Sequence, residues 1–269
     1  MMKRIFGLLF AVLLVAALAA CGGKEEDTLV VGATNKPHAE ILEKAKPPLE
    51  EKGIKLKIET FSKYELVNPA LDKGDLDANY FQHIPYLENQ VKEHGYDIVN
   101  AGGIHIEPIG IYSKKYKSLD EIEDGATVIM SSSVADHGRV LALFEANGLI
   151  KLREGIDKVT ATLEDIVENP KNLQFNYEYG PEMLPTIFNN NEGDLVVINS
   201  NYALDAGLNP IEDSIAIEDE NSPYVNIIAV RSEDKDREEI KTLVEVLRSK
   251  EIQDFILEEY GGAVVPVSE

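Results

Sequence analysis

The chain has 269 residues, which is enough for one large domain or two modest ones. Hydrophobic residues make up 44% of it and charged residues 28%, a balance typical of a globular protein. Its 48 acidic residues outnumber the 26 basic ones. This argues against nucleic acid as a partner and against attachment to anionic lipids by charge, because both depend on Lys and Arg.

The amino-terminal segment has the pattern of a secretion signal. Lys3 and Arg4 give it a positive start. The apolar run Ile5–Leu18 that follows is shorter than the roughly 20 residues needed to span a bilayer. We therefore predict a signal peptide over residues 1–20.

Cys21 is the only cysteine of the chain, and it follows Leu18-Ala19-Ala20. This junction resembles a bacterial lipoprotein signal, in which the Cys thiol is acylated after the leader is cut off. Several acyl chains on Cys21 would hold the mature chain on the extracytoplasmic side of a bacterial membrane. A plain secretory signal with a chance Cys is the alternative. Residues 21–27 are polar, and we expect them to form a short tether.

After the tether, apolar runs alternate with helical patterns. The first three elements are a buried strand at residues 28–33, a helix from Pro37 to about Gly53 and a strand at residues 54–59, which is the order of a parallel crossover unit. Further strands are predicted at residues 97–99, 108–112, 127–130, 173–177, 195–198 and 224–230. Further helices are predicted at residues 85–93, after residue 136, after residue 162, at residues 185–188 and twice after residue 230.

This alternation runs once before Tyr112 and once after it. The simplest architecture is an α/β fold with two lobes. Residues 28–112 and 225–269 would form the first lobe, and residues 113–224 the second. Ligands of such sheets bind beyond the carboxyl ends of the strands, so we expect a ligand in the cleft between the lobes.

The stretch Asp75–Tyr86 concentrates aromatic and amide side chains. Tyr80, Phe81 and His83, with Tyr64 nearby, could line an apolar pocket in which a thioether contacts the rings. An aromatic cluster of the core without a ligand is the alternative, because aromatic groups are more often core than site.

Arg139 stands in the first turn of the helix that follows the strand at residues 127–130. Its planar guanidinium suits a carboxylate, and the amino end of a helix favours an anion. The alternative is a surface Arg that neutralises Asp136 or Glu145, since most exposed ion pairs do little.

Amide side chains occupy corresponding places after two other strands. Asn199 and Asn201 follow the strand at residues 195–198, and Asn226 lies in the returning crossover. Amides offer both a donor and an acceptor, so they could bind an amino or a carboxyl group. Each of them alone is also an ordinary turn residue. His105 and Tyr112 complete the candidate set, with a structural histidine as the alternative for His105.

The sequence carries no motif of a known catalytic chemistry. It has no GxSxG, no Walker loop and no GxGxxG, and its five histidines show no zinc-type spacing such as HExxH. We therefore predict a binding protein rather than an enzyme, with no catalytic residue, metal or cofactor.

Several segments together resemble the methionine-binding lipoprotein family, whose members supply ATP-binding-cassette (ABC) importers of D- and L-methionine. These segments are Val31–Thr34 with Pro37–Leu42, Asp77–His83 with Pro85–Leu87, Tyr112-Ser113 with Lys117–Glu121, Gly148–Leu152, Glu168–Leu173 and Ser222–Asn226. The resemblance covers residues 28–267, nearly the whole mature chain. It implies the two-lobed periplasmic-binding-protein (type II) fold, which closes on its ligand.

The resemblance also implies roles for single residues. Carried over position by position, it assigns Tyr64, Tyr80, Phe81 and His83 to an aromatic pocket wall, Arg139 to the ligand carboxylate, and Asn226 with one of Asn199 and Asn201 to the ligand backbone. It implies reversible binding of methionine by a monomer, with the permease and ATPase subunits of an importer as partners.

The chain departs from the family pattern at two places. The family commonly has Pro-Asn-Asp-Pro-Thr-Asn before the Arg, where this chain has Ser131–Asp136, and often Pro-Gly where it has Asn35-Lys36. These changes keep a methionine-containing dipeptide or another small amino acid open as the ligand. A surface-anchored adhesin or signalling lipoprotein without a transport role is the second alternative.

Overall fold

The computed structural model describes residues 28–219 and 222–267. The predicted signal peptide, Cys21 and the tether lie outside these residues. Among the helices that the structure describes, none combines the length and the apolar character needed to cross a bilayer.

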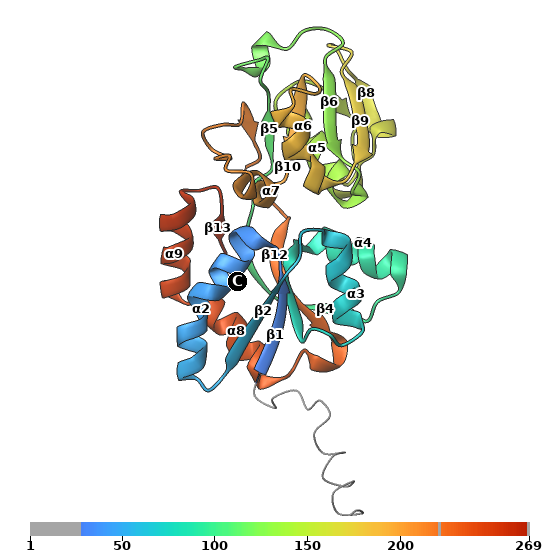
Figure 1. Ribbon diagram of the computed structural model, residues 1–269. Helices are drawn as coiled ribbons and strands as arrows, with labels where there is room; N and C mark the ends of the chain where they lie inside the picture. Colours follow the sequence, from blue (N-terminus) through green and yellow to red (C-terminus); the bar gives the residue numbers. More distant parts are fainter. Residues whose placement is uncertain (1–27, 220–221, 268–269) are drawn as a thin grey trace, which may run out of the picture.

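The first large sheet has six strands in the order β13-β4-β12-β3-β1-β2. β1 runs parallel to β2 and β3, whereas β12 lies antiparallel between β3 and β4. The strands are β1 (Thr28–Ala33), β2 (Lys55–Thr60), β3 (Ala78–His83), β4 (Ile98–Ile106), β12 (Val225–Arg231) and β13 (Val265–Pro266). The helices packed around this sheet are α2 (Glu40–Glu51), α3 (Val67–Asp72), α4 (Ile84–His94), α8 (Glu238–Leu247) and α9 (Lys250–Tyr260) (Figure 1).

The second large sheet has five strands in the order β11-β5-β10-β6-β9. Its strands are β5 (Gly110–Tyr112), β6 (Thr127–Ser131), β9 (Gln174–Tyr179), β10 (Leu195–Ile198) and β11 (Ala216–Ile217). Its helices are α5 (Val134–Ala146), α6 (Leu184–Asn189) and α7 (Ser200–Asp205). A separate pair of short strands, β7 (Lys151–Leu152) and β8 (Ile166–Glu168), lies in the same part of the chain.

Short helical turns connect these elements. In the first part of the fold they are η1 (Asn35–Ala39), η2 (Tyr64–Leu66) and η7 (Ser232–Asp234). In the second they are η3 (Leu119–Glu121), η4 (Lys158–Thr160), η5 (Leu163–Asp165) and η6 (Pro181–Met183).

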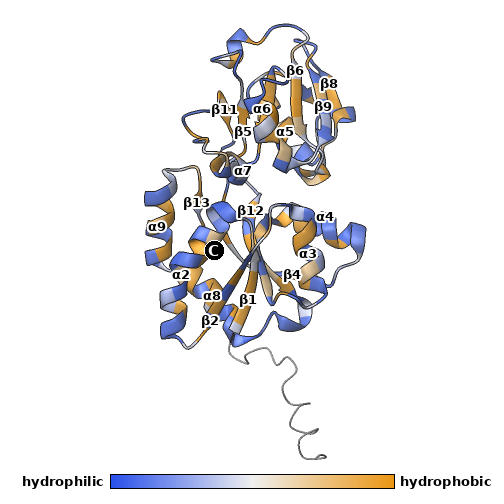
Figure 2. Ribbon diagram, viewed as in Figure 1, coloured by the Kyte–Doolittle hydropathy of each residue, from blue (hydrophilic) through white to orange (hydrophobic). Residues whose placement is uncertain are grey.

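Hydrophobic patterning explains why each sheet forms its own core. Central strands such as β1 and β6 are hydrophobic along most of their length, and the helices turn their hydrophilic sides outward (Figure 2). The edge strand β2 alternates instead, with Leu56 buried between the exposed Lys55 and Lys57. Tyr80 packs on one face of the first sheet with residues of α2 and α8, and Phe81 packs on the other face with residues of α3 and α4.

Two crossover segments join the sheets (Figure 1), and α5 and α7 of the second part contact α4 and η1 of the first. The chain first crosses between Ile106 and Gly110, because β5 pairs with β10 and β11 in the second sheet. The expected lobe boundary after residue 112 is therefore too late by the length of β5. The apolar run of β5 suits either lobe, so the sequence does not reveal which sheet it joins. The chain returns between Ile217 and Val225.

Candidate ligand-binding site

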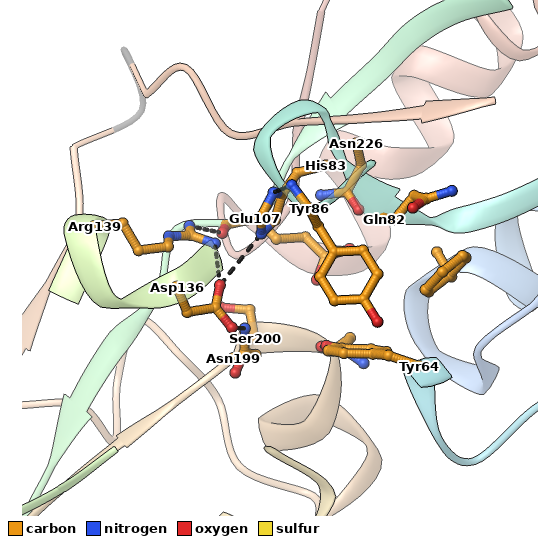
Figure 3. A pocket seen from close by; sticks show the side chains of 12 residues that line it. Tyr64, Gln82, His83, Tyr86, Glu107, Asp136, Arg139, Asn199, Ser200 and Asn226 are labelled. Atoms are coloured by element: carbon orange, nitrogen blue, oxygen red, sulfur yellow. Dashed lines mark hydrogen bonds and ion pairs between the residues drawn. The ribbon is translucent and has the colours of Figure 1, made fainter. Parts of the chain in front are cut away.

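A pocket lies between the two sheets, beside the crossover segments (Figure 3). The first sheet and its helices contribute Tyr64, Phe81, Gln82, His83, Tyr86 and Asn226. The second sheet's helices contribute Asp136, Arg139, Asn199, Ser200 and Asn201, and Glu107 comes from the first crossover. The pocket therefore occupies the place expected for a ligand at the strand ends of a two-lobed α/β protein.

Three rings form the apolar wall of the pocket. The ring centroids of Tyr64 and Phe81 are 5.8 Å apart, those of Phe81 and Tyr86 5.8 Å, and those of Tyr64 and Tyr86 5.9 Å. Each pair is tilted or edge-on, which is the favourable arrangement for aromatic neighbours. The predicted pocket residues Tyr64 and Phe81 thus meet here, and Tyr86 joins them.

Three predicted site residues lie outside the pocket lining. Tyr80 faces the opposite side of β3, because successive strand residues point to opposite faces, and its hydroxyl bonds His105 Nδ1. His105 is fully buried behind the pocket. Tyr112 packs against Phe188 in the core of the second sheet, with ring centroids 5.8 Å apart. These three are structural side chains and do not line the cavity.

Arg139 is buried, with 4% of its surface exposed, so it is not the surface Arg of the alternative interpretation. Its Nη2 donates to the backbone carbonyl of Glu107 at 2.9 Å and to the carboxylate of Glu218. The ring of Tyr224 lies 4.5 Å from the guanidinium carbon, and Nε has no partner. Burial would lower the pKa of Arg139, but Glu218 and Asp136 beside it outweigh burial and raise that pKa.

Gly138 explains how α5 brings Arg139 to this place. A Cβ at this position would collide with the backbone carbonyls of Lys158 and Val159. The helix therefore sits directly on the backbone of η4, which only a residue without a side chain permits. This close packing fixes the start of α5, and with it the positions of Asp136 and Arg139.

The three predicted asparagines all line the pocket and are all buried. Asn199 Nδ2 donates to Asp136 Oδ2 at 3.2 Å, which leaves Asn199 Oδ1 without a partner. Tyr64 OH donates to Asn201 Oδ1 at 2.5 Å, which leaves Asn201 Nδ2 without one. Asn226 Oδ1 accepts from His38 Nε2 at 3.1 Å. Buried polar atoms without a partner are rare in proteins, so those of Asn199 and Asn201 mark a place where a ligand can bind.

Asp136 connects the two lobes. It is 1% exposed, and its Oδ1 accepts from His83 Nε2 at 3.2 Å (Figure 3). His83 Nδ1 accepts from the backbone N–H of Tyr86 at 3.1 Å, so His83 is the neutral tautomer with its proton on Nε2. Burial alone would raise the pKa of Asp136, but hydrogen bonds from His83 and Asn199 and the charge of Arg139 hold that pKa below its usual value.

Glu107 is the second buried carboxylate of the pocket. His105 Nε2 donates to its Oε1 at 2.7 Å, and His38 Nε2 lies 3.1 Å from the same oxygen. His38, His105 and Glu107 are also the one group in the described part of the chain with the composition of a metal site. Their separations are those of hydrogen bonds, and Thr34 and Tyr80 occupy the other ring nitrogens. A metal would have to displace this network.

Sequence reasoning missed five lining residues, namely Gln82, Tyr86, Glu107, Asp136 and Ser200. Glu107 directly follows the end of β4, so the rule that places site residues after buried strands could have found it. The sequence indicates Asp136 only as a partner of Arg139 in an ion pair. Its contact with His83 joins residues 53 apart in sequence and leaves no local signal.

Comparison with known proteins places this architecture in the class of two-lobed periplasmic binding proteins. Residues 29–268 match the sequence profile described as NlpA lipoprotein. The chain belongs to the NlpA lipoprotein family.

Relatives of known name agree with this assignment. A methionine-binding lipoprotein of Bacillus subtilis (strain 168) is 52% identical, and the match covers 100% of both chains. The solved structure of a pheromone precursor/lipoprotein of the YaeC family from Enterococcus faecalis V583 is 57% identical over 89% of this chain and 100% of its own, with a TM-score of 0.87. A nutrient binding protein from Burkholderia cenocepacia, solved bound to methionine, is 42% identical over 88% of this chain and 99% of its own, with a TM-score of 0.83.

Proposed function

We propose that this chain is the lipid-anchored substrate-binding protein of an ABC-type amino-acid importer, and that its pocket binds methionine reversibly. The observation that carries the proposal is that one cavity combines buried donors, buried carboxylates and an apolar wall. Arg139 Nε and Asn201 Nδ2 are buried donors without partners, Asp136 and Glu107 are buried carboxylates, and three rings form an apolar wall. A free amino acid has a carboxylate, an ammonium and a side chain to match these three features.

The rings favour a thioether among amino-acid side chains. Methionine is unbranched and flexible, and its sulfur makes favourable contacts with aromatic rings. The wall of Tyr64, Phe81 and Tyr86 offers ring faces and edges from three directions. The methionine named for the Bacillus subtilis relative and bound in the Burkholderia cenocepacia structure supports this choice.

Closure of the lobes would report the bound ligand to the importer. Among the described residues, contacts that join the lobes directly include the hydrogen bonds from Tyr64 OH to Asn201 at 2.5 Å, from Tyr202 OH to the carbonyl of Ser62 at 3.2 Å, and from His83 to Asp136 at 3.2 Å. Residues that also line the pocket make two of these bonds. A ligand that contacts both lobes therefore shifts the population toward the closed form, which the permease and ATPase subunits would recognise.

Membership in a lipoprotein family supports the remaining parts of the proposal. Acylation of Cys21 would anchor the chain on the extracytoplasmic face of the membrane, and binding would leave the ligand chemically unchanged. An enzyme would convert the ligand instead. An adhesin or signalling lipoprotein with an empty cleft would show no thermal shift with any small molecule.

The experiment that tests the proposal identifies the ligand directly. The mature chain is purified without added amino acids, and whatever co-purifies is identified by mass spectrometry. After unfolding and refolding to remove it, L-methionine, D-methionine, glycyl-methionine and other amino acids are compared by calorimetry. We expect intact methionine and a melting temperature that rises with ligand, since about 100 times the Kd stabilises by about 2.7 kcal/mol. Binding of a dipeptide or of another amino acid in preference would refute methionine as the ligand.

A further inference from the structure

The charges around the pocket do not balance. Among the described residues that line it, Arg139 is the one Lys or Arg, whereas Asp136 and Glu107 both bring a carboxylate. The Arg139 guanidinium is already paired with Glu218, which comes from the returning crossover and is not part of the lining. The positive charge of the pocket is therefore neutralised from behind by the protein itself.

Glu218 is held in this position by its own contacts. Its Oε2 accepts from the backbone N–H of Ile109 at 3.2 Å, and its Oε1 accepts from the hydroxyl of Ser222 at 3.0 Å. Its backbone N–H bonds the carbonyl of Ile109 at 2.9 Å. These bonds tie both crossover segments to Arg139, so Glu218 is a fixed partner of the guanidinium.

The carboxylates on the pocket side are balanced less well. The Arg139 guanidinium bonds Glu218, and its Nη1 lies 4.0 Å from Asp136 Oδ1, beyond hydrogen-bond distance. His83 is neutral because its Nδ1 accepts a backbone N–H, so it gives Asp136 a hydrogen bond but no positive charge. Asn199 likewise donates only an uncharged N–H to Asp136. The imidazoles of His105 and His38 act on Glu107 in the same way, as hydrogen-bond partners. His105 donates to Glu107, and His38 also bonds Asn226.

We propose that the pocket selects its ligand by the protonated amine far more than by the carboxylate. This inference rests on the proposed function and narrows the substrate class to methionine compounds with a free amino group. One guanidinium faces the carboxylates of Glu218, Asp136 and Glu107, and the ammonium of the ligand would add a second positive charge to this group. The carboxylate meets a guanidinium already paired with Glu218 and the uncharged Nδ2 of Asn201, both of which bind a carboxamide oxygen as well.

Methionine and two analogues of nearly equal shape separate the contribution of the ammonium from that of the carboxylate. L-Methioninamide keeps the ammonium and loses the negative charge, and L-2-hydroxy-4-(methylthio)butanoate keeps the carboxylate and loses the ammonium. Their Kd values are measured by calorimetry at a pH where the amine of methioninamide is protonated. We expect methioninamide to bind within about tenfold of methionine. The hydroxy acid should bind at least about 100-fold more weakly, because unpaired buried charges weaken binding by factors of this order.

Two variants move the selectivity in opposite directions. Asp136→Asn removes one of the two pocket carboxylates, so the preference for methionine over the hydroxy acid should shrink by about tenfold or more. Glu218→Gln frees the guanidinium, so the preference for methionine over methioninamide should grow by about tenfold or more. Asp120→Asn, an exposed change of the same charge, is the matched control and should alter neither ratio.

The outcomes are distinct. If methioninamide loses as much affinity as the hydroxy acid, or more, the inference is overturned. It is also overturned if Glu218→Gln leaves the preference for methionine over methioninamide unchanged, and this test stands even where Asp136→Asn does not fold. If methionine itself does not bind to the unaltered protein, the proposed function fails and not the inference about its amine.

Discussion

The two buried imidazoles behind the pocket should make the fold sensitive to acid. His38 is 1% exposed and His105 fully buried. Burial lowers the pKa of His38 from 6.5 to about 4, and that of His105 from 6.5 to about 3. Below pH 6.5 the unfolded chain therefore takes up protons that the folded chain does not, so stability is present above that pH and is lost as the pH falls.

The magnitude follows from the two shifts. Each ring that stays neutral in the folded chain while it is charged in the unfolded chain costs about 1.4 kcal/mol per pH unit, or about 3 kcal/mol between pH 6.5 and about 4.5. Glu107 acts in the opposite sense. Burial raises its pKa, so its folded form takes up a proton first as the pH falls, which offsets part of the loss from the two rings.

The test is the pH dependence of the unfolding free energy without ligand, measured by urea denaturation and circular dichroism. His105→Phe keeps an aromatic ring beside Tyr80 but removes one titrating group. The variant should be less stable at neutral pH, because it loses the bond to Glu107, yet its stability should fall less steeply in acid. We expect the slope below pH 6.5 to shrink by about 1.4 kcal/mol per pH unit.

An exposed histidine provides the control for this slope. His94→Phe changes a ring on the surface of α4 and should leave the acid slope of the unaltered chain in place. The reasoning is refuted if His105→Phe keeps the full slope, or if nuclear magnetic resonance shows the His105 ring gaining its proton near pH 6.5.

Three further predictions concern binding and the anchor. Arg139→Ala should weaken methionine binding by about 2–5 kcal/mol, since the ligand carboxylate would then lie near Asp136 and Glu218 without a cationic donor, and calorimetry with unchanged affinity would remove Arg139 from the site. Tyr64→Phe deletes the interlobe hydrogen bond to Asn201 and should weaken binding by about 0.5–1.5 kcal/mol; the fold is checked by its unchanged melting temperature without ligand. Cys21→Ala should move the protein from the membrane fraction to the soluble extracytoplasmic fraction, and retention on the membrane would contradict lipidation at this residue.

The strands were the most predictable part of the fold, because burial leaves a local signature. The apolar runs at Thr28–Ala33 and Leu195–Ile198 have the same bounds in the structure as in the sequence prediction. The sequence carries no such local signature for which strands pair with one another. The sequence could not show that β5 joins the second sheet, since its short apolar run fits the core of either lobe.

The pocket lining was predictable where its residues follow a strand end, and less so where they depend on packing across the cleft. Arg139 and the three asparagines line the pocket as expected. Tyr80 was placed in the pocket with Phe81, although neighbours in a strand face opposite sides. Asp136 could not be assigned from sequence, because its two partners, His83 and Asn199, come from distant parts of the chain.

The glycine at position 138 limits how this pocket can change in evolution. Because α5 rests on the backbone of η4 there, no larger residue at 138 can be accommodated without lifting the helix. Selectivity can therefore diverge by exchanging the side chains at 136 or 139, but not by tilting the helix that carries them. Relatives with different ligands should keep this contact and differ in the groups it presents.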